Sequence, residues 1–211
     1  MKIKSASFIA LISVCAILLS QFLYFTFSFI HFLGSRLVLW YKASEVLFEI
    51  GWIGILVFFV ALYKKSVKIG AASTRRATLF ALASVCVMVL CDTINTALYL
   101  ADVQGSRGLM VLTTVTNVIW PLAWIGIIFF FKSLYNRTQA TTINTPTLVA
   151  LISSCVLALR ALANISINII QYATGPGSMN ALAWYKTSAV LGLLGWVGML
   201  IFFVALYNHQ K

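Results

Sequence analysis

The phrase WIGILVFFVALY at residues 52–63 decides the fold, because it returns as WIGIIFFFKSLY at 124–135 and as WVGMLIFFVALY at 196–207. Successive copies are 72 residues apart. Hydrophobic bias alone would align many Leu and Val residues. It would not align Trp, Gly, Phe and Tyr in one register three times. The phrase therefore predicts an internal repeat built from a supersecondary unit.

A second motif alternates with the first and completes the repeat. Ala-Leu-x-Ser-x-Cys occurs at 10–15, 81–86 and 150–155, and a Leu follows each Cys four residues later. We therefore expect three tandem copies of a two-helix hairpin. Their bounds are 1–68, 72–140 and 144–211. Two crossings per copy give all copies the same orientation, which predicts pseudo-threefold symmetry about an axis along the membrane normal.

The composition of the 211-residue chain indicates that it lies in a membrane. Hydrophobic residues make up 62% of it and charged residues 9%, whereas a soluble domain carries about 25% charged residues. Six stretches are long and apolar enough to cross about 30 Å of hydrocarbon as helices. They run over 6–32, 43–63, 77–101, 109–135, 147–173 and 187–208. We expect an all-α integral membrane protein with one membrane domain over residues 1–211.

The basic residues predict the orientation of the helices. Ten of the fifteen Lys and Arg residues fall at the two termini and in the segments 64–76 and 132–146. Four fall on the opposite face, and Arg160 lies inside a helix. The positive-inside rule then places both termini in the cytoplasm, and we expect a plasma membrane, the bacterial inner membrane. The net charge of +11 does not indicate a nucleic-acid partner, because no nucleic-acid-binding motif accompanies it.

The repeated aromatic residues have a structural interpretation. Each repeated Trp lies eleven residues before the repeated Tyr, which is about 16 Å along a helix, so Tyr belongs at the interface and Trp near mid-membrane. We expect these Trp rings to pack between helices, and the Gly two residues later to allow close helix contact. A cofactor or substrate role for the rings is the alternative. Trp-Tyr-Lys at 40–42 and 184–186 suits the opposite interface.

The repeated cysteines allow a sharper hypothesis. Cys15, Cys86 and Cys155 are equivalent positions, so a threefold axis would let three thiolates bind a soft metal such as Cu(I). The alternative is a small residue at a helix contact. No His or Met recurs beside them to complete a metal site, so we expect no cofactor.

Ionisable residues within the predicted helices are the candidates for function, because a charge at mid-bilayer costs about 2.5–3.5 kcal/mol and is rare unless it is paired or lines a cavity. Asp92 and Arg160 lie at similar depth in two equivalent helices, and Glu45 and Glu49 share one helix face. Amide side chains share this level. The predicted binding residues are Asp92, Arg160, Glu49, Asn95, Asn117, Asn164 and Glu45.

These residues support two hypotheses from different classes. A polar layer in the outer half, over an apolar floor, predicts an outward-facing pocket for transport or binding of a small polar or anionic solute, or an ion. The alternative is a non-transporting sensor or assembly subunit, with a membrane partner or a second copy, in which an Asp92–Arg160 pair and amide hydrogen bonds are structural. An enzyme is disfavoured, because the chain has two histidines and no hydrolase or nucleotide motif. Acid–base chemistry by Asp92 and Glu49 is the remaining enzymatic alternative.

Overall fold

A computed structural model describes residues 3–29, 36–70, 72–100, 107–139, 141–174 and 179–210. They form six α-helices, each of which is long and apolar enough to span a membrane. The helices are α1 (Ile3–Phe29), α2 (Arg36–Ile69), α3 (Ala72–Leu100), α4 (Arg107–Thr138), α5 (Asn144–Thr174) and α6 (Met179–His209). This confirms the expected all-helical fold with six apolar helices of membrane-spanning length.

Five of the six helices, α2 to α6, are longer than the apolar stretches that predicted them. The second stretch ends at residue 63, but α2 continues to Ile69 through Lys64, Lys65 and Lys68. Lysine is a good helix former, so the helix continues until a residue stops it. Gly70 stops it by adopting a φ of 71°, the left-handed conformation in which many helices end.

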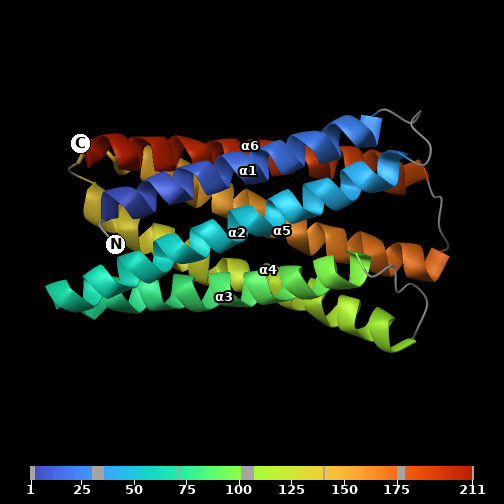
Figure 1. Cartoon of the computed structure of the whole chain (residues 1–211), viewed down its shortest axis with the longest axis horizontal. Coiled ribbons are helices and arrows are strands. Elements are labelled where there is room, and N and C mark those ends of the chain that lie inside the picture. The colour runs from blue at the N-terminus through green and yellow to red at the C-terminus, as the bar shows by residue number, and fades with distance from the viewer. Residues whose placement is uncertain are drawn as a thin grey trace.

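The six helices form a closed ring in chain order. Each helix packs against its neighbours in the chain, and α1 packs against α6 to close the ring. Figure 1 shows the helices roughly along one common direction, with the N- and C-termini at the same end of the bundle. We call this the termini end, and we call the other end, where α1, α3 and α5 finish, the hairpin end.

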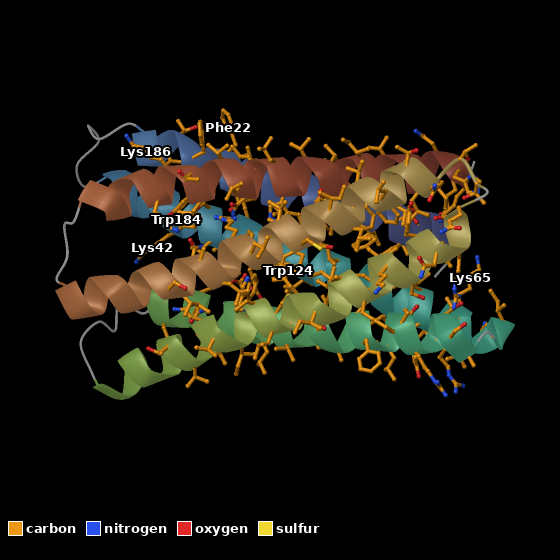
Figure 2. All side chains as sticks on the ribbon, turned by 180° about the vertical axis from the view of Figure 1, so that it is seen from behind. Phe22, Lys42, Lys65, Trp124, Trp184 and Lys186 are labelled. Carbon is orange, nitrogen blue, oxygen red and sulfur yellow. The ribbon has the colours of Figure 1, made fainter. Side chains whose placement is uncertain are left out.

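Large aromatic side chains of α2, α4 and α6 fill the centre of the ring. Trp52, Trp124 and Trp196 contact one another in pairs, with ring centroids 5.8, 5.4 and 6.1 Å apart, and all three are buried. Trp124 lies near the middle of the bundle in Figure 2. The packing role expected for these rings is therefore realised in the structure.

A layer of six Phe side chains lies closer to the termini end. Its interhelical contacts run from one even-numbered helix to the next, with centroids 5.0–5.2 Å apart in near-perpendicular, edge-to-face geometry. The pairs are Phe59–Phe130, Phe131–Phe202 and Phe203–Phe58. Edge-to-face pairs contribute about 0.5–1.5 kcal/mol each beyond the area that they bury. The Phe pairs thus tie α2, α4 and α6 together without close backbone contact.

Glycine provides the close contacts between the helices of each hairpin. A Cβ atom on Gly54 would overlap Ser13, one on Gly126 would overlap Ser84, and one on Gly198 would overlap Ser153. Each Gly is the one that follows the repeated Trp by two residues, and each Ser belongs to the Ala-Leu-x-Ser-x-Cys motif. The two repeated motifs are therefore the two sides of one helix–helix contact.

The outside of the ring is apolar. Phe22 is 55% exposed and points away from the bundle in Figure 2, and Leu159 is 65% exposed. Cys15 and Cys86 are also exposed, and Cys155 is partly exposed, so these thiols face outward and do not converge on an axis. Within the described ranges, no group of three His, Cys, Asp or Glu residues is arranged to hold a metal ion. The hypothesis of a three-thiolate metal site is wrong, because the equivalent Cys positions lie on the outer face of their helices.

Candidate functional site

A cavity of about 300 Å³ lies between the aromatic centre and the hairpin end. Side chains from all six helices line it. The floor of the cavity is aromatic and consists of Phe48, Trp120, Trp124 and Trp196. Phe48 and Trp120 each lie three residues closer to the termini end than a polar lining residue of the same helix. Trp124 and Trp196 belong to the central Trp cluster. The cavity therefore has aromatic rings below and polar groups around its sides.

Arg160 carries positive charge into this cavity from α5. Its Nη1 donates a hydrogen bond to Oε1 of Gln21 on α1, at 2.9 Å, and its Nε donates to Oγ of Ser188 on α6, at 3.0 Å. Both partners are uncharged. The guanidinium is thus held by dipoles, directed toward α1 and α6, and it has five N–H donors in all.

Gly192 makes room for this guanidinium. A Cβ atom at position 192 would collide with Nη1 and Cζ of Arg160 and with Oε1 of Gln21. The corresponding residues in the other two hairpins, 72 and 144 positions earlier, are Trp120 and Phe48. The third hairpin therefore lacks a ring where the other two have one, and the Arg160 head group occupies that space.

Acidic side chains lie on a different part of the wall, where α2 meets α3. Asp92 is 7% exposed, and its carboxyl group lies within hydrogen-bonding reach of Glu49, with Glu45 nearby. The hydroxyl of Thr93 donates to Oε1 of Glu49 at 2.5 Å. Oδ2 of Asp92 and Oε2 of Glu49 are both buried and have no hydrogen-bond partner among the described residues. Buried carboxylate oxygens without donors are costly, so this corner attracts a proton or a cation.

Amide groups connect the helices of the second and third hairpins at the same level. The Thr116 hydroxyl donates to Oδ1 of Asn95 at 2.9 Å, and the Ser188 hydroxyl donates to Oδ1 of Asn164 at 3.0 Å. The Trp184 indole also donates to Oδ1 of Asn164, at 3.1 Å. These bonds position two amides at the cavity wall and leave their NH₂ groups as further donors.

Asn117 adds a third amide, on α4. Pro121 lies four residues further along this helix, and a proline has no N–H with which to bond the carbonyl of the residue four before it. The main-chain carbonyl of Asn117 therefore lacks its usual intrahelical donor. A polar side chain and a carbonyl without its usual helical donor occur together at one residue that lines the cavity.

Most of the residues predicted as a site line this one cavity. Asp92, Arg160, Asn95, Asn117, Asn164 and Glu45 line it, and Glu49 lies behind Asp92 at the α2–α3 contact. Asp92 and Arg160 do not meet. Within the part of the chain that the structure describes, the hydrogen bonds of Arg160 go to Gln21 and Ser188, and Asp92 is directed toward α2.

Sequence reasoning missed several residues that line the cavity or contact the side chains that line it. Ser188 stands eight residues before the repeated Trp196. Ser44 and Thr116 hold the same position before the other two repeated Trp residues, so the spacing of 72 residues was the signal that could have identified Ser188. Trp184 was assigned to the membrane interface, but its indole bonds inside the bundle. For Gly192 the signal was a departure from the repeat, a glycine where the other copies have aromatic residues.

Comparison of the chain with models of known protein families, with curated proteins and with solved structures finds no match.

Proposed function

We propose that this multi-pass membrane protein binds a small polar or anionic solute, or an ion, in the cavity and transports it across the membrane. One observation carries the proposal: Arg160 holds a positive charge at the wall of a cavity, and its hydrogen-bond partners among the described residues are neutral. A charge inside a membrane protein that lacks a counter-ion is a functional feature by default. An anionic group on the solute would supply the missing charge.

The proposed setting is the bacterial inner membrane, with both termini in the cytoplasm and the cavity open to the outside. The distribution of Lys and Arg supports this orientation, because ten of fifteen fall near the two chain ends and in the segments 64–76 and 132–146 of the sequence. Figure 2 places Lys65 at that end of the bundle, far from Lys42 and Lys186 at the other. A solute would then enter from the hairpin end and meet the aromatic floor.

We also propose that the bundle is three copies of one hairpin, arranged about a pseudo-threefold axis. The contacts Phe59–Phe130, Phe131–Phe202 and Phe203–Phe58 support it. The first contact joins the first hairpin to the second, the second contact joins the second hairpin to the third, and the last joins the third hairpin to the first. The three Gly–Ser contacts support it in the same way. Transport would involve rocking of hairpins about this axis.

A second function, that of a non-transporting sensor or assembly subunit, is favoured by one specific observation. The Thr116–Asn95 and Ser188–Asn164 hydrogen bonds each join the two helices of a hairpin, as a purely structural polar layer would. The variant Arg160→Gln separates the two functions, because the loss of its charge should abolish ligand binding in a transporter and should change no ligand binding in a structural subunit. It removes the charge, and its amide remains able to bond Ser188 or Gln21.

The test is thermal unfolding of the purified full-length protein in detergent, with a panel of inorganic ions and small polar metabolites. We expect at least one compound to stabilise the wild type, because a ligand at 100 times its Kd stabilises by about 2.7 kcal/mol. It should not stabilise Arg160→Gln, whose elution volume and circular dichroism should match the wild type. Uptake into proteoliposomes, with the compound recovered chemically unchanged, then separates transport from catalysis. Equal stabilisation of both proteins, or of neither, contradicts the proposal.

A further inference from the structure

We infer that the solute is a small zwitterion, which carries an ammonium group and an acidic group on one molecule. This inference rests on the proposed function and specifies the class of solute. It follows from the positions of the charges around the cavity, from the rings of its floor and from its volume.

The cavity has a basic group and a set of acidic groups on different parts of its wall. Arg160 is directed toward α1 and α6, and Asp92 is directed toward α2, beside Glu45 and Glu49. Two opposite charges at one depth in a membrane would ordinarily pair, because each alone is costly there. Among the described residues they do not, and a cavity that both line lies between the helices that carry them. The arrangement leaves room for a ligand that supplies both missing partners.

A solute with a single charge fits this wall poorly. An anion would reach Arg160 and bring negative charge toward Asp92, Glu45 and Glu49. A cation would reach these carboxyls and bring positive charge toward Arg160. Like charges placed close together in an enclosed site cost several kcal/mol, and this cost is a source of specificity. A zwitterion meets both parts of the wall with the opposite sign and adds no net charge to the membrane interior.

The floor of the cavity favours the ammonium group in particular. Phe48, Trp120, Trp124 and Trp196 line it, and an ammonium group over an aromatic face is attracted by the ring quadrupole. Methylated ammonium groups interact especially well with such rings. Both amino acids and betaines therefore share the chemistry that this site recognises.

The volume limits the size of the solute. A cavity of about 150 Å³ holds benzene, so the cavity here, about 300 Å³, holds a molecule of roughly twice that size. An amino acid with a side chain of modest size, or a betaine, satisfies this limit. A longer peptide or a nucleotide does not.

The experiment compares each zwitterion with its two halves. Probes for amino acids are alanine with ethylamine and propionate, and phenylalanine with phenethylamine and 3-phenylpropanoate. Probes for betaines are glycine betaine with tetramethylammonium and acetate. Binding is measured with the full-length protein in detergent, by thermal unfolding and then by equilibrium dialysis. We expect one of the three zwitterions to bind at least about tenfold more tightly than either half, the change typical of one hydrogen-bonded charge.

Two variants assign the two charges. Arg160→Gln should weaken binding of the zwitterion and of the acid, and should not weaken binding of the amine, because it removes a charge that repels a cation. Asp92→Asn should weaken binding of the zwitterion and of the amine, and should not weaken binding of the acid, because it removes a group that repels an anion. Lys65→Gln, which removes an exposed charge at the termini end, is the control and should change none of the three. Where Arg160→Gln or Asp92→Asn fails to fold, Arg160→Lys and Asp92→Glu replace them, and both should keep the preference for the zwitterion at reduced affinity.

The outcomes separate this inference from the proposed function. If the acid binds as tightly as the zwitterion, the inference is wrong and the proposed anion site stands. If no amino acid or betaine binds, but another compound stabilises the wild type and not Arg160→Gln, the inference is again wrong and the proposed function survives. If no compound of any class stabilises the wild type, both are wrong.

Discussion

Arg160 occupies its place because residue 192 has no side chain. The corresponding positions in the other hairpins hold Trp120 and Phe48, both of which line the floor of the cavity. At this position the third hairpin differs from the other two, because a residue without a ring leaves room for a charged head group. Asp92 is a similar departure, since the corresponding residues are Gln21 and Ala161. The chemistry of the cavity thus arises where single residues break the repeat.

The first prediction concerns Gly192. Ala in a helix interior is more stable than Gly by about 1 kcal/mol, so Gly192→Ala should stabilise the protein unless the added methyl group displaces a neighbour. Here it would collide with the Arg160 guanidinium. We expect a loss of ligand affinity of at least about tenfold, equal to 1.4 kcal/mol, with the elution volume unchanged. Val190→Ala, at an exposed position of the same helix, is the control, and unchanged ligand affinity in Gly192→Ala would contradict the role of Gly192.

The second prediction concerns the indole of Trp52. Its Nε1 is buried and has no acceptor among the described residues, which costs about 1–3 kcal/mol. Trp52→Phe removes this donor and keeps an aromatic ring in the cluster, so the gain offsets the loss of volume. We expect the free energy of unfolding in SDS titrations to change by less than about 1 kcal/mol, whereas Trp52→Ala should cost about 3–5 kcal/mol. A cost of Trp52→Phe similar to that of Trp52→Ala would mean that the indole N–H is satisfied.

At the scale of the helix, the hairpin contact depends on two small residues that face each other. Ser153 on α5 stands where Gly198 on α6 has no side chain, and the same holds for Ser13 with Gly54 and for Ser84 with Gly126. Apolar burial drives little association between helices in lipid, so close van der Waals packing at small residues takes its place. The Gly–Ser contact therefore sets how near the two helices of a hairpin can lie.

The third prediction tests this contact by a double-mutant cycle. Gly198→Ala should destabilise the protein by about 1–3 kcal/mol through overpacking, because the new methyl group would overlap Oγ of Ser153. Ser153→Ala removes that oxygen, and the next nearest atoms lie at 3.1 and 3.2 Å. The double variant should therefore recover most of the loss, with a coupling energy of at least about 1 kcal/mol in SDS unfolding. Additive effects would show that the two residues do not limit the approach of the helices.

Depth in the bundle was predictable from the sequence, but direction around each helix was not. Counting residues at 1.5 Å each places Asp92 and Arg160 at one level, and the structure has both at the cavity wall. Which neighbour each side chain faces depends on how far each helix is rotated about its own axis. Packing of the whole ring fixes that rotation, so the Arg160–Ser188 bond and the Asp92–Glu49 contact could not be predicted from spacing. The helix ends were also missed, because hydropathy marks the apolar part of a helix and not its capped ends.

At the scale of the whole molecule, the ring is closed and its interior has two unlike halves. The half toward the hairpin end holds the polar cavity, and the half toward the termini end is filled by Phe and Trp rings. Figure 1 shows both chain ends at the termini end of the bundle. If the cavity is open to one side of the membrane only, that side is the one opposite the termini.

The fourth prediction tests which side of the membrane the cavity faces. In a chain whose Cys15, Cys86, Cys91 and Cys155 are replaced by Ala, Asn117→Cys should react with a membrane-impermeant thiol reagent added to intact cells. Asn117 lines the cavity, and the proposed orientation opens the cavity outward.

The control for this labelling is Lys65→Cys, an exposed position at the termini end. It should react only after the cells are broken. Labelling of Asn117→Cys only in broken cells would reverse the proposed orientation. Labelling of both positions in intact cells would contradict the expectation that the aromatic centre separates the cavity from the termini end.

The interlocked Trp and Phe rings have a consequence for leakage. Nine rings from three helices meet edge to face along the centre, and the six Phe rings among them offer no oxygen or nitrogen through which a chain of water molecules could relay protons. The layer of Phe rings should therefore resist proton leakage, and transport as proposed here would require these rings to move apart.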